Sequence, residues 1–331
     1  QVEVVRGPAT LLYGSNAVGG VVNVLTDRIP RVTTDRSVRG SVDLFGGTVA
    51  EYWGGRGSVD AGTGLLQVHG DFLKRKTGNY SIPGYAWSEA VRAAEEGLHD
   101  EEEEVESPFG VLPNSDLDSQ GGSVGLSFIG SRGFIGASFT GYDTNFGIPP
   151  GLHSHEEDEH EGEEHGDEGE LHEEHDHDDH DEGEDHEEHD HGDIRSDLRQ
   201  RRFDLDSELH EPFSGFRTAK LRFGVADYTH AEVEGDGAIG TQFFNDAWEG
   251  RLELNHKPWG LARGSFGLQV GHRELEAVGE EAFMPPTKTN AWGLFAFEDL
   301  GHGPWKLQLG VRYENQKMET FGEDPSSRDL S

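Results

Sequence analysis

Residues 305–317 read WKLQLGVRYENQK, and their side chains alternate between apolar and polar. The apolar set consists of Leu307, Leu309, Val311 and Tyr313, and the polar set consists of Lys306, Gln308, Arg312 and Glu314. Successive side chains of a β-strand point to opposite faces, so this stretch predicts a strand with one apolar and one polar face.

The same alternation recurs along most of the chain from Ser37 onward. About eleven runs show it, at 38–44, 51–60, 66–72, 123–128, 134–142, 198–211, 216–231, 248–257, 264–274, 290–299 and 305–317. Glycine, at 47 of 331 residues, suits crowded and curved strands. We therefore expect an all-β protein built from antiparallel strands.

Two all-β architectures fit this pattern: a soluble sandwich or barrel with one wet face, and an outer-membrane barrel. The predicted connections at 61–64, 131–133, 211–215, 257–263 and 301–304 are short, and those at 76–119, 145–196, 232–246 and 275–289 are long. Alternating short and long connections place every long loop at the same end of an up-and-down sheet. Outer-membrane barrels show this asymmetry, so the membrane barrel is favoured.

The overall composition excludes several other classes of protein. Asp and Glu total 65 against 27 Lys and Arg, giving a net charge of -38, and cysteine is absent. Phosphates repel such an acidic surface, which argues against a nucleic-acid binder. The sequence also lacks an apolar run of ~18 residues, so it predicts no transmembrane helix. Because cysteine is absent, no disulfide is expected either.

Much of the acidic charge lies in residues 153–193, which contain 23 Asp or Glu, 11 His and no Lys or Arg. With almost nothing apolar to bury, this segment is predicted to be a disordered, solvated loop. Imidazole and carboxylate groups together suit Zn²⁺, and Cu²⁺ and Ni²⁺ suit the same donors. The alternative is an inert acidic tether, which would not need histidine. The candidate ligands are His153, His155, His160, His165, His172, His175, His177, His180, His186, His189 and His191.

A second candidate metal site lies on the predicted strand 219–232. Alternation places His230 and Glu232 on the polar face near the end of the strand, where an imidazole and a carboxylate would supply two metal ligands. The alternative role for both side chains is hydrogen bonding inside the lumen. His69 and Asp71 share a polar face in the same way.

The first thirty residues carry a resemblance to a known family. Residues 2–26 read VEVVRGPATLLYGSNAVGGVVNVLT, a predicted strand–helix–strand unit whose glycines do not match a dinucleotide-binding fingerprint. The segments VEVVRGP, YG and AVGGVVNV closely resemble the end of the plug domain of TonB-dependent outer-membrane receptors. Residues 112–116, 145–149, 227–232 and 279–283, with the His-rich loop, resemble the zinc-uptake (ZnuD-like) subgroup.

This resemblance implies a 22-stranded transmembrane antiparallel β-barrel closed by a plug, in the outer membrane of a Gram-negative bacterium. Residues 1–30 would be the C-terminal part of the plug. Residues 31–331 would form the N-terminal half of the barrel, about 11 of 22 strands, with long extracellular loops at 76–119 and 145–196. We expect the rest of the plug upstream and the remaining strands downstream. A half barrel leaves open edges, so the fragment alone should neither insert into lipid nor transport.

The implied partners are outer-membrane lipid, the periplasmic TonB energy-transducing complex and a divalent metal ion. We expect an importer of that ion, zinc first, with no organic cofactor. Nothing resembles a nucleophile–base pair, so we do not expect an enzyme. One alternative is a receptor for a siderophore or cobalamin-type chelate, which would favour aromatic and arginine-lined loops. Another is a surface barrel that buffers metal or adheres without transport.

Overall fold

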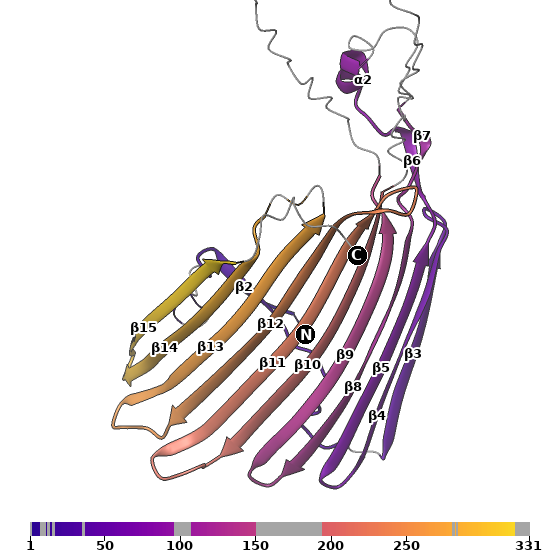
Figure 1. Ribbon diagram of the computed structural model, residues 1–331. Helices are drawn as coiled ribbons and strands as arrows, with labels where there is room; N and C mark the ends of the chain where they lie inside the picture. The colour runs from indigo at the N-terminus through magenta and orange to yellow at the C-terminus, as the bar shows by residue number, and fades with distance from the viewer. Residues whose placement is uncertain are drawn as a thin grey trace, which may run out of the picture.

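The computed structural model describes residues 2–6, 11, 14, 17–34, 37–95, 107–149, 194–279, 282 and 284–321. Most of these residues form one curved 11-stranded antiparallel sheet, in the order β15-β14-β13-β12-β11-β10-β9-β8-β5-β4-β3 (Figure 1). Its strands are β3 (Val38–Gly47), β4 (Tyr52–Thr63), β5 (Leu66–Thr77), β8 (Leu117–Gly130), β9 (Gly133–Gly147), β10 (Arg195–His210), β11 (Phe216–Val233), β12 (Ile239–His256), β13 (Ala262–Gly279), β14 (Thr287–His302) and β15 (Trp305–Thr320). The all-β prediction is confirmed.

Short turns join neighbouring strands at one end of the sheet, the lower end in Figure 1. The turn between β4 and β5 has only two residues, and its Gly64 has a φ of 57°, a left-handed conformation that glycine adopts without strain. The opposite end carries the long connections. One of them contains a separate two-stranded sheet of β6 (Tyr80–Tyr85) and β7 (Phe109–Leu112) and the short helix α2 (Glu89–Glu95).

One predicted long loop, at 232–246, is wrong. β12 begins at Ile239, and it pairs with β11 up to Val233, so only five residues connect the two strands. Apolar alternation marks only the lower part of β12, which is why the sequence predicts a start near 248. Above it, Gln242 and Asp246 interrupt the apolar alternation on the outward face. The backbone ladder continues there nevertheless, because main-chain hydrogen bonds do not require apolar side chains.

The N-terminal residues identify the concave face of the sheet. β1 (Val2–Arg6) and β2 (Gly20–Val24) form a two-stranded sheet, and residues 28–34 then run along the concave face of the large sheet. Thr34 hydrogen-bonds to Gln67 of β5, and Arg31 forms an ion pair with Asp206 of β10. We call this face lumenal and the opposite face outward.

The two faces have opposite chemistry along neighbouring rows of hydrogen-bonded strands. The lumenal row contains only polar residues and glycine: Gln67, Ser127, Gly136, Asp206, Arg222, Arg251, Gln269, Gly293 and Glu314. One residue away, the outward row consists of Leu66, Phe128, Ile135, Ser207, Leu221, Leu252, Leu268, Leu294 and Tyr313. All members of the outward row except Ser207 are apolar or aromatic.

Burial is inverted relative to a water-soluble protein. Ser127 and Ser196 on the lumenal face are 0% exposed, whereas outward Val124 is 64% exposed. Within the described ranges no second layer covers the outward apolar side chains. Aromatic residues gather near the short turns on exposed positions, among them Phe213, Trp259 and Trp305, as in the interfacial girdles of membrane barrels. The sandwich alternative does not fit this arrangement.

None of the described helices is long and apolar enough to span a membrane.

Candidate functional site

Residues 28–34 are fixed to the lumenal wall by buried polar contacts. Arg31 Nη2 lies 2.7 Å from Asp206 Oδ2, and Asp206 is 8% exposed. The backbone N–H and the hydroxyl of Thr34 both donate to Gln67 Oε1 at 3.1 Å, and Gln67 is 1% exposed. Charge-assisted and buried hydrogen bonds of this kind are among the stronger ones in proteins.

Two strand glycines leave room for this segment. A Cβ atom at Gly125 would overlap the carbonyl oxygen of Arg28, and one at Gly136 would lie 2.5 Å from Ile29 Cγ2. Ile29 is 8% exposed and therefore well packed. The wall is thus shaped to receive these residues, which we call the seated segment (residues 28–34).

A second contact between the N-terminal residues and the wall lies at β15. Leu11 occupies the space where a side chain at Gly310 would lie, and Gly14 lies close to the side chains of Arg312 and Glu314.

His230 and Glu232 lie on the lumenal face near the long-loop end of β11, where strand parity predicts them. His230 pairs across the ladder with Leu198 and Phe243, and its ring stacks on Phe243 with 5.4 Å between centroids. Glu232 pairs with Ser196 and Thr241. Their role as metal ligands stays a prediction.

Several buried polar atoms around this pair lack a hydrogen-bond partner within the described part of the chain. They are His230 Nε2, Thr144 Oγ1, Ser196 Oγ, Thr241 Oγ1 and Asn245 Oδ1. Most buried polar groups in proteins are hydrogen-bonded, so a cluster of unpaired ones is unusual. Water or a ligand would satisfy them. The sequence did not identify the hydroxyls, because only the register shows that Ser196 and Thr241 flank Glu232.

The described residues contain no group of three or more His, Cys, Asp or Glu side chains able to hold a metal ion. His230 and Glu232 would therefore form an open pair that needs donors from elsewhere. The eleven candidate histidines of the loop at 153–193 lie outside the described residues. Their predicted roles stay predictions.

His69, unlike His230, has both ring nitrogens in contact with carboxylate groups. Its Nδ1 lies 2.7 Å from Asp60 Oδ1 and its Nε2 lies 3.1 Å from Asp71 Oδ2, and the residue is 7% exposed. Ser123 also binds Asp71. Both ring nitrogens are already engaged by carboxylates, so neither is available to a metal ion.

A clamp of side chains joins the two ends of the His-rich loop. The Asn114 side-chain amide donates to the carbonyl oxygens of Ile148 and Ile194, both at 2.7 Å, and the Ile148 N–H donates to the Ile194 carbonyl at 2.9 Å. Arg195 binds both carboxylate oxygens of Asp116 at 2.9 Å. Hydrogen bonding and charge from Arg195 lower the pKa of Asp116 below its ordinary value. The loop thus begins and ends at one rigid point on the rim.

Comparisons with known proteins agree with this fold. No family model matches the chain. Over 45 residues, 14% of the chain and 5% of the relative, it is 53% identical to the ferric enterobactin receptor PirA of Pseudomonas aeruginosa PAO1.

Solved structures match over almost the whole chain. They include the copper transporter OprC (TM-score 0.64, 12% identity, 96% of this chain and 44% of that one). The FrpB iron transporter of Neisseria meningitidis in its apoprotein form gives a TM-score of 0.62 at 11% identity, over 96% of this chain and 46% of that one. The siderophore receptor PirA gives 0.57 at 14% identity, over 96% and 44%.

The chain spans less than half the length of these proteins. It has the fold of the TonB-dependent outer-membrane receptors, which are β-barrels of the outer membrane. These neighbours are named as transporters and receptors.

Proposed function

We propose that this chain is part of a TonB-dependent receptor that imports a divalent metal ion, zinc before copper or nickel. The observation that carries the proposal is the composition of the His- and carboxylate-rich segment 153–193. Ile148 and Ile194, which flank this segment, are held together at the rim by Asn114. Neutral imidazole and carboxylate are suitable ligands for these ions, and the negative charge would concentrate cations near the mouth. The copper transporter OprC among the structural neighbours supports a metal ion as cargo.

The lumenal wall offers a second candidate binding site for the ion, below the loop. Among the described residues, His230 Nε2 is buried without a hydrogen-bond partner, and the Glu232 carboxylate lies on the same face two residues away. A cation leaving the loop would meet these two donors and the unpaired hydroxyls of Ser196 and Thr241. Displacement of the plug by the periplasmic TonB complex would then open the path, a step that rests on the family resemblance alone.

A siderophore or similar chelate is the second candidate cargo, and two observations favour it. The 45-residue match is to a ferric enterobactin receptor. In addition, the folded loop between β5 and β8 carries Tyr85 and Phe109 with ring centroids 4.8 Å apart, and Arg92 lies 3.9 Å above the Tyr85 ring. Aromatic rings and a guanidinium suit a planar, anionic chelate better than a bare ion.

A surface barrel that only buffers metal is the third candidate. It shares the loop chemistry but requires no energy and no passage through the lumen. A competition uptake assay on the full-length protein separates the three, using labelled Zn²⁺ against Cu²⁺, Ni²⁺ and a ferric siderophore, with and without the energy source. Import predicts energy-dependent zinc accumulation that the siderophore does not inhibit.

His230→Ala tests the candidate binding site at His230 and Glu232. We expect the zinc concentration for half-maximal uptake to rise roughly tenfold, the scale at which losing a group in or beside a metal site acts. His210→Ala is the matched control, because His210 is a lumenal histidine at the opposite end of β10 with a side chain 55% exposed. Zinc uptake that persists without energy would support buffering, and inhibition by the siderophore would support the second candidate.

A further inference from the structure

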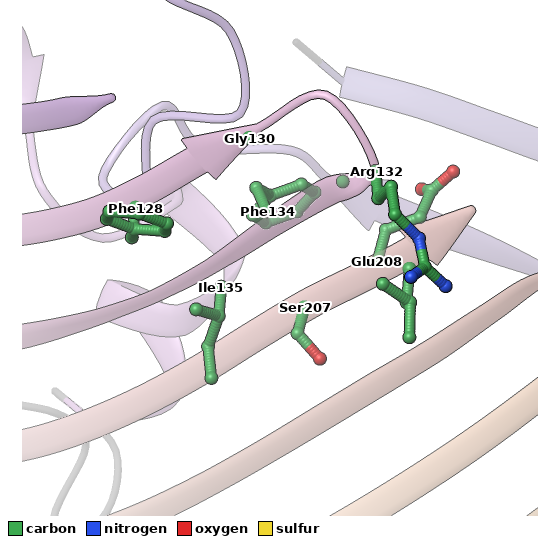
Figure 2. A pocket seen from close by; sticks show the side chains of 9 residues that line it. Phe128, Gly130, Arg132, Phe134, Ile135, Ser207 and Glu208 are labelled. Atoms are coloured by element: carbon green, nitrogen blue, oxygen red, sulfur yellow. The ribbon is translucent and has the colours of Figure 1, made fainter. Parts of the chain in front are cut away.

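The outward row contains one polar member, and the wall is hollowed beside it. Ser207 pairs with Ile135 on one side and Leu221 on the other. A serine between two branched side chains leaves space, and a hollow of about 360 Å³ lies there. Its lining consists of Phe128, Gly130, Arg132, Gly133, Phe134, Ile135, Ser207, Glu208 and Leu209 (Figure 2).

The hollow opens on the outward side of the sheet. Phe128, Ile135 and Ser207 belong to the outward row, and Phe128 and Ile135 are 52% and 54% exposed. Figure 2 shows the Arg132 side chain pointing to the same side as Ile135 and Ser207. Glu208 alternates to the lumenal side, where its carboxylate lies 3.2 Å from His210 Nε2 and 3.6 Å from Lys220 Nζ.

The short turns beside the hollow carry a positive rim. Arg132, Arg217 and Lys257 are exposed. Backbone hydrogen bonds tie their turns together: the His210 N–H donates to the Arg132 carbonyl at 2.7 Å, and the Lys257 N–H donates to the Gly215 carbonyl at 2.8 Å. The only carboxylate of this rim among the described residues is Glu211, which Lys257 binds at 2.9 Å. The rim therefore carries three positive side chains, Arg132, Arg217 and Lys257, and a single negative one among the described residues, so its net charge is positive.

An apolar floor, one hydroxyl and a basic rim match one class of ligand. A hydroxyl facing hydrocarbon is unfavourable unless it finds a polar partner, and lipid-facing polar residues are usually functional. The short turns of outer-membrane barrels lie at the periplasmic side, and basic groups at a membrane surface attract anionic headgroups.

We propose that this hollow binds an anionic phospholipid of the periplasmic leaflet. An acyl chain lies against Phe128, Ile135 and Leu209, the glycerol ester region accepts a hydrogen bond from Ser207, and the phosphate contacts Arg132. The neutral headgroup of phosphatidylcholine would gain less from the rim, and free phosphate would make no use of the apolar floor. This inference goes beyond the proposed function and does not depend on which cargo is imported.

Native mass spectrometry of the delipidated full-length protein tests the site. The protein is titrated with phosphatidylglycerol, phosphatidylcholine, lipopolysaccharide or inorganic phosphate, and retained adducts are counted. We expect one phosphatidylglycerol to be retained in preference to phosphatidylcholine. Arg132→Gln should weaken its retention roughly tenfold, the scale of one hydrogen bond to a charged group.

Ser207→Leu is the second variant, because leucine is the commonest residue of the outward row and should fold normally while filling the hollow. It should also weaken retention of phosphatidylglycerol. Arg199→Gln is the matched control, since Arg199 is an exposed arginine near the long-loop end and should leave retention unchanged. Equal retention of both phospholipids, retention of lipopolysaccharide in place of phosphatidylglycerol, or unchanged retention in both test variants would overturn the proposal.

Discussion

The backbone of Arg28 packs against the lumenal face of the barrel wall at Gly125. A methyl group added at Gly125 would overlap the Arg28 carbonyl oxygen. Gly125→Ala should therefore push the seated segment off β8 and destabilise the protein by about 1–3 kcal/mol, the usual range for overpacking. The measurement is the temperature at which the folded barrel loses its heat-modifiable electrophoretic mobility.

Gly271→Ala is the matched control for this substitution. Gly271 is also a lumenal strand glycine, but its Cβ would lie no closer than 3.6 Å to a neighbouring atom. Equal transition temperatures for the two variants would show that residues 28–34 do not rest on Gly125.

Single residues differ in how well the sequence predicts them. Strand parity alone is enough to place His230 and Glu232 on one face, because alternation is local. Pairing Glu232 with Ser196 and Thr241 requires the register of three strands, which depends on loop lengths. The sequence likewise does not distinguish Gly125 and Gly136 from the other glycines, since their purpose is a contact with residues about a hundred positions away.

Among the elements, the strands are predicted better than their ends. Each outward apolar stretch marks a strand, yet β12 extends nine residues above its regularly alternating part, because the backbone ladder continues where Gln242 and Asp246 interrupt the alternation. The 76–119 connection contains its own small sheet, which apolar alternation does not signal. Short turns, in contrast, lie close to their predicted positions.

The clamp between Asp116 and Arg195 allows a pH prediction at the scale of elements. Because Arg195 lowers the pKa of Asp116 in the folded state, the ionised pair stabilises the loop base above the ordinary pKa near 3.8, and that stability is lost as pH falls through the lower folded value. Both side chains are about a third exposed, so we expect only about 1 kcal/mol.

Hydrogen exchange of the Ile148 amide measures this local stability. At pH 7, Asp116→Asn should speed exchange roughly fivefold, the factor that corresponds to 1 kcal/mol. The difference from the wild type should disappear in strong acid, where Asp116 is protonated in both states. Glu211→Gln is the control, because it breaks an exposed ion pair at the opposite end of the sheet. A ratio of exchange rates that does not change with pH would contradict the assignment.

At the scale of the whole molecule, every conclusion depends on which medium each face meets. The inverted burial, with polar residues inside and apolar residues exposed outside, was predictable from alternation combined with loop asymmetry. Neither signal alone separates a membrane barrel from a soluble one. This inside-out arrangement decides how three features are interpreted: the seated segment and the His230–Glu232 pair lie on the lumenal face, and the hollow at Ser207 faces lipid.

Collision accessibility of single spin labels tests that arrangement most directly, and these 331 residues contain no cysteine of their own to compete for the label. In the full-length protein in bilayers, labels at the outward positions Leu252 and Leu268 should collide with oxygen more than with a polar nickel chelate. Labels at the lumenal positions Glu253 and Gln269 should show the reverse. If the outward labels meet the nickel chelate as readily as the lumenal ones, these strands do not face lipid and the account fails.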